Sequence, residues 1–338
     1  MKRVLSAILV VLMLVSLTAC GGAKAEPLKF GMGITTVYGE ATSADGETDG
    51  KTEVDATAAA VLLDAEGKIV QLVIDTAQNT ATYTSEGKGV ANTAFKTKGE
   101  KGTEYGMAAY GKDLNGDGVV KEWNEQVAAF IASVEGKTID EVKAMVVDGY
   151  GNADIQTAGC TIAVSEFVGA VEKAVANAKE SAAAAENTLQ LGVVTAEEVT
   201  DATEEKSGTI EQNISFTAAV VDKDGKVVVA ATDVVQAQLT FDTKGAALTD
   251  TAAELKTKAE KGTDYGMAAY GKDLNGDGVV KEWNEQGAAF DAALVGKTAA
   301  EIGGLVVEGY GVEEIQTAGC TIAISDMVAA AVKAATVA

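Results

Sequence analysis

The chain has 338 residues, 47% of them hydrophobic, and its 27 basic and 50 acidic residues give a formal net charge of −23. This apolar fraction is typical of a folded protein, and the acidic excess argues against nucleic acid or anionic lipid as a partner, because both would repel it. The chain contains no histidine and only three cysteines, without a CxxC pair. Histidine-based nucleophile pairs, the common zinc sites and a cysteine-held iron–sulfur cluster are therefore excluded.

The first 19 residues have the pattern of a signal peptide. A basic start, MKR, precedes the apolar run LSAILVVLMLVSL, which is short for a membrane span and closes on LTAC at Cys20. This site resembles the bacterial lipobox, which implies that Cys20 is lipidated and that residues 20–27 tether the protein to the outer side of the cell membrane. The alternative is an ordinary cleaved signal that leaves a free thiol.

The rest of the chain is an internal repeat. Residues 101–126, KGTEYGMAAYGKDLNGDGVVKEWNEQ, recur at 261–286 with one change, and IQTAGCTIA occurs at 155–163 and again at 315–323. Core packing alone tolerates conservative substitutions. Surface residues that are identical in the two copies therefore indicate that each copy carries a site. We place the boundary near Ala183, which gives repeat 1 at residues 28–183 and repeat 2 at residues 184–338.

Each repeat is predicted to begin with β-structure. Residues 54–75 and 214–233 each contain two β-branched runs separated by a glycine turn, a pattern that predicts a hairpin. A further extended segment follows at residues 80–89 in repeat 1 and at residues 237–246 in repeat 2.

The second half of each repeat is predicted to be helical. Four apolar residues recur at helical spacing after position 122 and form one face, and repeat 2 preserves the pattern. In each repeat, a capping box is expected to begin a second helix, and a serine followed by an acidic residue is expected to cap a third. The residues are Trp123, Val127, Phe130 and Val134; Trp283, Phe290 and Leu294; Thr138 with Glu141 and Thr298 with Glu301; Ser165 with Glu166 and Ser325 with Asp326.

The alanine-rich residues 175–188 predict that the third helix of repeat 1 continues into a linker. Together the elements predict an α+β fold of two homologous tandem domains, each a small, mainly antiparallel sheet with about three helices.

A loop before the first long helix resembles an EF-hand-type calcium site. It places oxygen-bearing side chains at positions 1, 3 and 5 and a glycine at position 6, but position 12 is Asn124 instead of glutamate. Weak, extracellular-range calcium binding is one interpretation, and a plain turn is the other. The candidate ligands are Asp113, Asn115 and Asp117 in repeat 1, and Asp273, Asn275 and Asp277 in repeat 2.

The segment Ala158-Gly159-Cys160-Thr161, repeated as Ala318-Gly319-Cys320-Thr321, is the second candidate site. Small residues beside a threonine leave the backbone accessible, and the hydroxyl can be esterified. The alternative is a tight turn that leads into a short buried strand. Equivalent cysteines on the two copies are expected to be small buried thiols and not a disulfide.

This segment resembles the Ser-Gly-Ala-Thr motif of flavinylated proteins, in which an extracytoplasmic flavin transferase links FMN through its phosphate to the last threonine. The lipobox, the tandem copies and the YGM…KEWNEQ stretch are similar to flavin-carrying lipoproteins of Gram-positive bacteria that serve extracellular electron transfer. The resemblance implies covalent FMN on Thr161 and Thr321. Alanine and cysteine replace the usual serine and alanine, and Thr157 and Thr317 are the alternative acceptors.

The resemblance implies a membrane-anchored electron carrier, not an enzyme, that takes electrons from a membrane redox donor and passes them to an extracellular acceptor. A covalent bond suits this location, because a diffusible cofactor would be diluted outside the cell. The alternative function is a calcium-stabilised binding or adhesion module without a redox cofactor. Several aromatic residues can stack on the flavin or pack in the core: Tyr105, Tyr110, Trp123, Tyr265, Tyr270 and Trp283.

Overall fold

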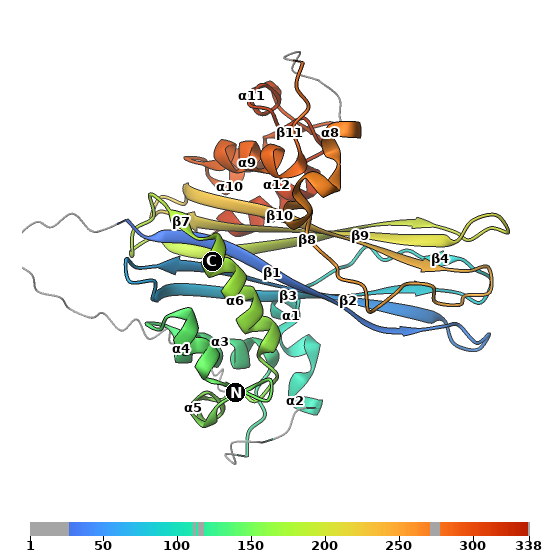
Figure 1. Cartoon of the computed structure of the whole chain (residues 1–338), viewed down its shortest axis with the longest axis horizontal. Helices are drawn as coiled ribbons and strands as arrows, with labels where there is room; N and C mark the ends of the chain where they lie inside the picture. The colour runs from blue at the N-terminus through green and yellow to red at the C-terminus, as the bar shows by residue number, and fades with distance from the viewer. Residues whose placement is uncertain (1–26, 111–112, 114–117, 271–277, 337–338) are drawn as a thin grey trace, which may run out of the picture.

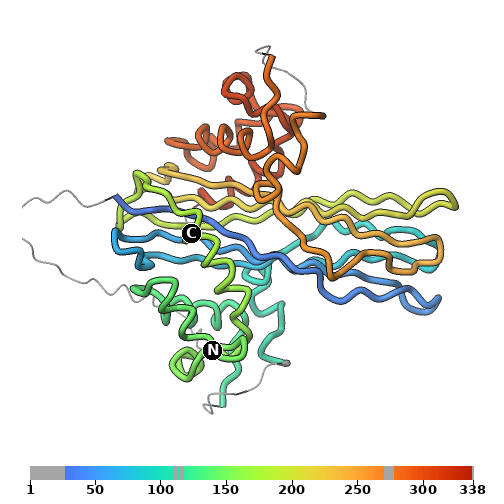
Figure 2. The backbone as a smooth tube through the Cα atoms, in the orientation of Figure 1, coloured from blue at the N-terminus to red at the C-terminus, as the bar shows by residue number. Residues whose placement is uncertain are grey.

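A computed structural model describes residues 27–110, 113, 118–270 and 278–336. The fold is α+β, as predicted. Two antiparallel sheets, one from each repeat, face each other in the middle of the molecule, and the helices of each repeat cover the outer face of that repeat's own sheet (Figure 1). The strands run along the long axis, and their hairpins extend past the helices at one end (Figure 2).

The two sheets have equivalent strands. Repeat 1 forms a sheet in the order β4-β3-β2-β1-β7, and repeat 2 forms one in the order β10-β9-β8. The strands are β1 (Lys29–Thr42), β2 (Gly50–Leu63), β3 (Ile69–Tyr83), β4 (Gly89–Val90), β7 (Lys179–Glu180), β8 (Thr188–Thr200), β9 (Gly208–Val221) and β10 (Val227–Phe241). Two short hairpins lie among the helices, formed by β5 (Val146–Val147) with β6 (Tyr150–Gly151) and by β11 (Val306–Val307) with β12 (Tyr310–Gly311).

The predicted hairpins are confirmed as β2–β3 and β9–β10. Their turns contain Gly67 and Gly225, whose φ angles of +78° and +73° are in the left-handed region that favours glycine. The strands β1 and β8 were not predicted, because glycines interrupt their sequences. An added Cβ at Gly33 would lie 2.3 Å from Ala174 N, so these glycines let a helix approach the strand closely.

The helical half is more divided than predicted. The long helix α3 (Trp123–Val134) is confirmed with its apolar face buried, and α4 (Ile139–Ala144) and α10 (Ala299–Gly303) begin with the predicted capping boxes. The remaining helices are α1 (Lys98–Lys101), the 3-10 helix η1 (Gly102–Tyr105), α2 (Met107–Tyr110), α5 (Ala153–Ala158), α6 (Ser165–Asn177), α7 (Lys258–Lys261), η2 (Gly262–Tyr265), α8 (Met267–Tyr270), α9 (Trp283–Leu294), α11 (Glu313–Thr317) and α12 (Ser325–Ala335).

Two helix predictions are wrong. Ser165 and Ser325 are the first residues of α6 and α12 and make no capping bond; Val164 and Ile324 occupy the cap positions. The alanine-rich stretch contributes only residues 175–177 to α6, which ends at Asn177, since the next residues form β7 and pair with β1. Sheet pairing thus overrides the helix propensity of this stretch.

The central strand β2 is buried on both faces. Ala58, Ala60 and Leu62 point into a core shared by the two sheets, while Ala59 and Val61 point into a second core under the helices of repeat 1. This double burial explains the uninterrupted apolar run in the sequence. Because the shared core contains strands of both repeats, the two copies are packed as one body.

Equivalent residues of the two repeats make reciprocal contacts. Ala44 N donates to Gly245 O at 2.8 Å, and in the mirrored contact Ala202 N donates to Gly87 O at 2.8 Å. The interface is therefore a pseudo-twofold one, like that of a C2 dimer within a single chain. The predicted boundary residue, Ala183, is buried in the shared core.

Ion pairs follow the same symmetry. Lys333 Nζ on α12 lies 2.6 Å from Glu100 Oε1 on α1, and Lys173 on α6 pairs with Glu260 on α7 at 2.5 Å. Each pair joins a helix of one repeat to a helix of the other.

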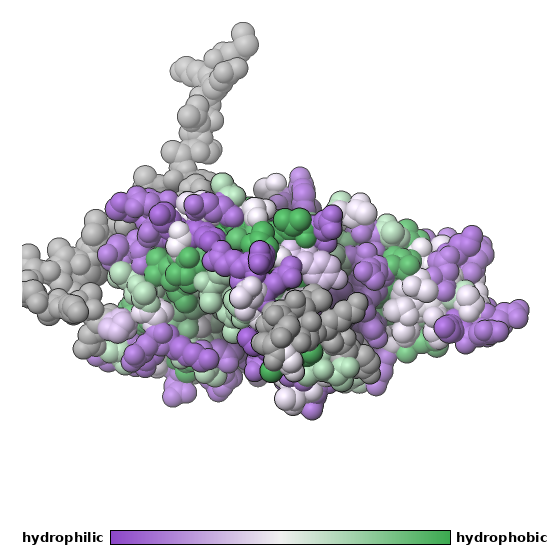
Figure 3. All heavy atoms as spheres, turned by 90° about the horizontal axis from the view of Figure 1, so that it is seen from above, coloured by the Kyte–Doolittle hydropathy of each residue, from purple (hydrophilic) through white to green (hydrophobic). Residues whose placement is uncertain are grey.

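The outer surface is strongly polar at the hairpin end of the molecule, where hydrophilic residues gather (Figure 3). The strand connections at residues 43–49 and 201–207, with the sequences SADGETD and DATEEKS, belong to this end. Within the described ranges, no helix combines the length and apolar character that crossing a bilayer requires.

Candidate functional site

The threonine segment of repeat 1 lies between α5 and α6, on the outer side of the helical layer. Gly159 ends α5 with a φ of +105°, Cys160 is fully buried, and Thr161 is half-buried. The buried cysteine fixes the segment in the core, so the threonine that follows stays at the surface. Thr157, the alternative acceptor, is exposed on the last turn of α5.

Gln126 on α3 orients Thr161. The backbone N–H and the hydroxyl of Thr161 both donate to Gln126 Oε1, at 2.8 and 3.1 Å. The glutamine is 1% exposed, and its Nε2 donates to Lys121 O at 2.9 Å. Because both ends of the amide are satisfied, its orientation is fixed. The hydroxyl hydrogen is directed inward, and the lone pairs of Oγ1 are left for another partner.

Lys121 lies across the backbone of the same segment. Its Nζ donates to Ala158 O at 3.1 Å, and a Cβ added at Gly159 would lie 2.1 Å from that Nζ. The lysine therefore occupies the space that a side chain at position 159 would need. Glycine is required there both by this contact and by its positive φ.

Cys160 and Cys320 are free, buried thiols, as predicted. Burial raises the pKa of each thiol to about 11. A thiol with this pKa is almost wholly protonated at neutral pH and is a poor nucleophile or metal ligand. The cysteine therefore anchors the segment by packing, and Thr161 carries its exposed functional group.

Repeat 2 reproduces the whole arrangement. Thr321 donates its N–H and hydroxyl to Gln286 Oε1 at 2.8 and 3.1 Å, and Lys281 Nζ donates to Ala318 O at 3.2 Å. Gly319 has a φ of +101° and meets the lysine in the same way. Two copies with the same geometry support a shared role for the segment.

A cleft of about 280 Å³ opens beside the threonine segment of repeat 1. Ile162 and Ala163, the two residues after Thr161, form one wall, and Trp123 lies in another. The tryptophan is 3% exposed and packs edge-on against Phe167, with ring centroids 5.9 Å apart. The cleft therefore has an aromatic side and is continuous in sequence with the threonine.

An ion pair forms the polar side of this cleft. Lys98 Nζ lies 3.5 Å from Asp55 Oδ1, and each side chain is only 14% exposed. The lysine also lies over the ring of Tyr105, 5.5 Å from its centroid. Burial raises the pKa of Asp55 to about 6, although the Lys98 ammonium acts in the opposite direction. Asp55 Oδ1 has no hydrogen-bond partner among the described residues.

Repeat 2 has an equivalent cleft of about 270 Å³, lined by Lys258, Trp283 and Ala323. Its charges differ, because Asn213 occupies the position of Asp55 and donates to Glu211 Oε1 at 2.9 Å. Burial lowers the pKa of the Lys258 ammonium, partly offset by Glu211. The two clefts therefore share a shape but not an electrostatic environment.

In each repeat, an aspartate holds the start of the helix that carries the cleft lysine. Asp75 accepts hydrogen bonds from the Thr97 hydroxyl at 2.6 Å and from Gly99 N at 3.0 Å, which ties the start of α1 to β3. In repeat 2, Asp233 accepts from Ala259 N at 3.1 Å. Burial raises the pKa of both aspartates, that of Asp233 to about 6.

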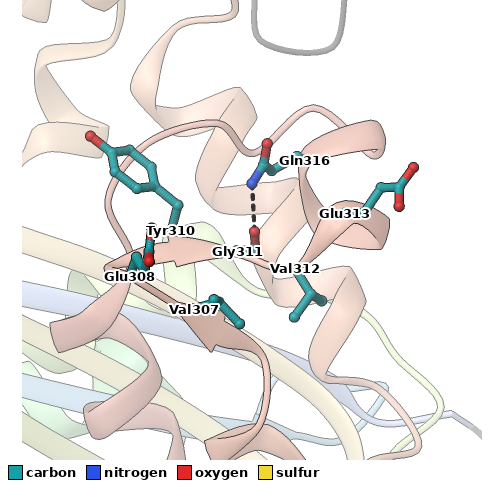
Figure 4. A pocket seen from close by; sticks show the side chains of 7 residues that line it. All are labelled: Val307, Glu308, Tyr310, Gly311, Val312, Glu313 and Gln316. Atoms are coloured by element: carbon teal, nitrogen blue, oxygen red, sulfur yellow. Dashed lines mark hydrogen bonds between the residues drawn. The ribbon is translucent and has the colours of Figure 1, made fainter.

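A larger hollow of about 640 Å³ lies over the β11–β12 hairpin (Figure 4). Tyr310 and Val307 line it, 45% and 61% exposed, and Gln316 turns away to donate to Gly311 O at 2.7 Å. The residues that line this hollow include no cation, and its charged residues are Glu308 and Glu313. It does not include the threonine segment.

The predicted aromatic residues divide between core and cleft. Trp123 and Trp283 are both buried and line their clefts. Tyr105 donates its hydroxyl to Gln78 Oε1 at 3.0 Å and lies under the cleft lysine. The side chains of Tyr110 and Tyr270 lie outside the described residues.

Most of the predicted calcium ligands also lie outside the described residues: Asn115, Asp117, Asp273, Asn275 and Asp277, as does the predicted lipidation site Cys20. Asp113 is described, and its Oδ2 accepts from Gly118 N at 2.8 Å, a bond that a calcium loop and a plain turn have in common. The part of the chain that the structure describes holds no cluster of three or more metal-binding side chains.

The lysine and glutamine that contact each threonine segment were not predicted: Lys121 and Gln126 in repeat 1, and Lys281 and Gln286 in repeat 2. They belong to the KEWNEQ stretch that is identical in both repeats, which was the available signal. Their contacts with the threonine segment could not be predicted, because the two stretches are separated by 35 residues or more in sequence. Comparisons with protein-family models, with curated proteins and with solved structures gave no match.

Proposed function

We propose that this protein is an extracytoplasmic electron carrier, held at the membrane by lipidated Cys20, with one FMN linked through its phosphate to each of Thr161 and Thr321. The observation that carries the proposal is the half-buried threonine whose hydroxyl is oriented by a buried glutamine, directly before two residues that line a cleft. The arrangement occurs twice with the same distances.

The residues present fit such a group. A cleft of about 280 Å³ is near the lower end of small-molecule pockets, so it suits part of a planar ring system whose other end is tethered outside. Trp123 and Phe167 offer an apolar side, and Lys98 offers a donor for the polar edge of the ring. Ile162 and Ala163, which directly follow Thr161, line the cleft, whereas Thr157 lies earlier, on α5; this favours Thr161 as the acceptor.

The attached flavin supplies reversible one- and two-electron transfer, which no side chain of this protein provides. The protein's own residues hold and orient it. Gln126 positions the acceptor hydroxyl, Cys160 anchors the segment, and Asp75 fixes the helix that carries the cleft lysine. A transferase modifies the threonine, and the acidic surface keeps the carrier in solution at the end of its tether.

The two sites lie on opposite sides of the molecule. Figure 1 shows α5, which precedes Thr161, at one extreme, and α11, which precedes Thr321, at the other, with both sheets between them. Two sheets about 10 Å apart and a helical layer on each side separate the sites by more than about 20 Å. Each flavin would therefore exchange electrons with partners at its own face.

Intact mass of protein taken from its native host tests the proposal. We expect the mass of the lipidated chain plus two FMN groups, and peptide mapping should place them on Thr161 and Thr321. The double variant Thr161→Val/Thr321→Val should lose the yellow colour and in-gel flavin fluorescence, while Thr157→Val/Thr317→Val should keep both.

Two results would contradict the assignment. Fluorescence that persists in the Thr161→Val/Thr321→Val chain would show that other residues carry the flavin. A native sample that weighs no more than polypeptide and lipid would leave an anchored binding module as the better description.

A further inference from the structure

We infer that Lys121 and Lys281 are phosphate-positioning residues, each holding the phosphodiester that joins FMN to the neighbouring threonine. The inference rests on the proposed function and adds a residue to each attachment site. It is drawn from the position of the lysine on the threonine segment, which is the same in both repeats.

The lysine is placed by the backbone it crosses. Lys121 Nζ donates to Ala158 O at 3.1 Å, directly above Gly159, and Thr161 follows two residues later. Through Lys121 O, which accepts from Gln126 Nε2, the same residue also supports the glutamine that orients the Thr161 hydroxyl. The ammonium and the acceptor hydroxyl are thus fixed on one small unit of structure.

Among the described residues, the ammonium is bound to backbone oxygen and not to a carboxylate. A lysine has three N–H donors, and Ala158 O takes one of them. No carboxylate of the described residues lies within 4.0 Å of Lys121 Nζ or Lys281 Nζ. A cation that pairs with no carboxylate of the described residues and lies beside an attachment point suits an oxyanion, because charge-assisted hydrogen bonds are about twice as strong as neutral ones.

A local cation is needed because the protein is strongly acidic. The formal net charge is −23, so a second anion placed on the surface is repelled by the field of the whole molecule. Each phosphodiester adds one negative charge at the threonine. The neighbouring ammonium offsets this charge where it develops.

The attachment step balances with a flavin dinucleotide as the donor. The Oγ1 of Thr161 attacks the flavin-side phosphorus; the new O–P bond forms as the bond to the bridging oxygen breaks, and a nucleoside monophosphate leaves with that oxygen. The hydroxyl proton passes to a base of the transferase. No electron is transferred, and Lys121 remains bound to the phosphate oxygens of the product.

The two repeats provide an internal control for the test. The full chain with Lys121→Gln is incubated with the flavin transferase and flavin dinucleotide, and the masses of the Thr161 and Thr321 peptides are followed over time. We expect attachment at Thr161 to slow by at least about tenfold, the equivalent of 1.4 kcal/mol, and attachment at Thr321 to be unchanged. Lys281→Gln should give the opposite pattern.

Two further measurements separate phosphate contact from a structural role. Lys121→Arg keeps the charge and the donors, so it should restore attachment at Thr161 to within about threefold of the wild-type rate. In the fully modified chain, the 31P resonance of the Thr161 phosphodiester should move in Lys121→Gln, while that of Thr321 stays in place.

The possible failures are distinguishable. If the wild-type chain accepts FMN at both threonines and Lys121→Gln modifies Thr161 at the same rate, the role of the lysine is overturned and the proposed function stands. If Lys121→Arg stays as slow as Lys121→Gln, the lysine does not act through its charge. If the wild-type chain accepts no FMN, the proposed function fails and this inference fails with it.

Discussion

The ring of Tyr83 stacks on that of Phe241, with centroids 4.8 Å apart and planes inclined by 3°. The two residues end equivalent strands, β3 and β10, and both are fully buried. Equivalent residues can meet in this way only on or near the pseudo-twofold axis that relates the repeats. The stack closes the shared core at the end of the sandwich that the helices do not cover.

Replacing Tyr83 with alanine should therefore destabilise the whole protein. We expect the free energy of unfolding to fall by about 3–5 kcal/mol, the usual cost of removing a buried aromatic ring, as measured by urea unfolding. Tyr83→Phe is the control, since Phe241 is its counterpart; it should lose about 1 kcal/mol with the hydrogen bond to Thr42 O. A loss below 1 kcal/mol in the alanine variant would show that the stack contributes little.

A glycine substitution tests the close contact between β1 and α6. Gly33→Ala would place a Cβ 2.3 Å from Ala174 N, so the helix must move. We expect a loss of about 3 kcal/mol or more in thermal or urea unfolding. Gly46→Ala is the matched control, because its φ is +90° but nothing lies within 4 Å; it should cost about 1 kcal/mol. Equal losses would argue against the packing explanation.

The carboxyl group of Asp291 on α9 predicts a pH dependence of stability. Its Oδ2 accepts from Thr232 N at 3.1 Å, whereas its Oδ1 is shielded from water without a hydrogen-bond partner. The pKa of Asp291 is raised to about 7, mainly by burial. The hydrogen bonds from Thr232 lower this pKa, and the nearby Asp233 raises it. Cys320, the other titratable group beside it, stays neutral in this range.

The sign follows from the raised pKa. The folded state holds the Asp291 proton more tightly than the unfolded state, so stability should fall as the pH rises from about 4 to about 7. Asp291→Ile introduces the residue found at the equivalent position of repeat 1, Ile131. This variant should not show the pH-dependent fall in the free energy of unfolding, which is on the order of a few kcal/mol. Urea unfolding at several pH values measures the slope. An unchanged slope in the isoleucine variant would assign the pH dependence to other groups.

The charge difference between the clefts predicts different reduction potentials for the two proposed flavins. Asp55→Asn removes a negative charge beside the flavin of repeat 1 and should raise its potential, while Asn213→Asp should lower that of repeat 2. At about 8 Å and an effective dielectric constant near 20, one charge is worth roughly 2 kcal/mol, or about 40 mV for a two-electron couple. Redox titration of chains with a single flavin measures the shift. Potentials that stay unchanged in both variants would place the flavin outside the cleft, because the effect of a charge fades with distance.

Because the sites lie on opposite faces, the two flavins should act in parallel. Thr161→Val should leave the rate at which the Thr321 flavin is reduced and reoxidised unchanged, within about twofold, since we expect each flavin to react directly at its own face, more than about 20 Å from the other. Stopped-flow absorbance with a soluble reductant measures this rate, and Thr321→Val serves as the reciprocal control. A large slowing in either variant would indicate transfer in series.

Local patterns in the sequence were sufficient for the hairpins around Gly67 and Gly225, for the apolar face of α3 and for the capping boxes at Thr138 and Thr298. These features depend on residues close together in the chain. The strand β1 was missed because its glycines lower strand propensity. Their role becomes visible only when α6 is placed against them.

By itself, the sequence determined that the chain contains two copies of one α+β unit and that the same surface letters recur in both, because identity at a fixed offset needs no structure to be seen. Only the tertiary structure decided that the sheets of the two copies share a core, and that Lys121 meets Ala158 and Gln126 meets Thr161 across 35 residues or more of chain. Contacts between segments so far apart depend on how the helices pack on the sheet, which local propensity does not specify.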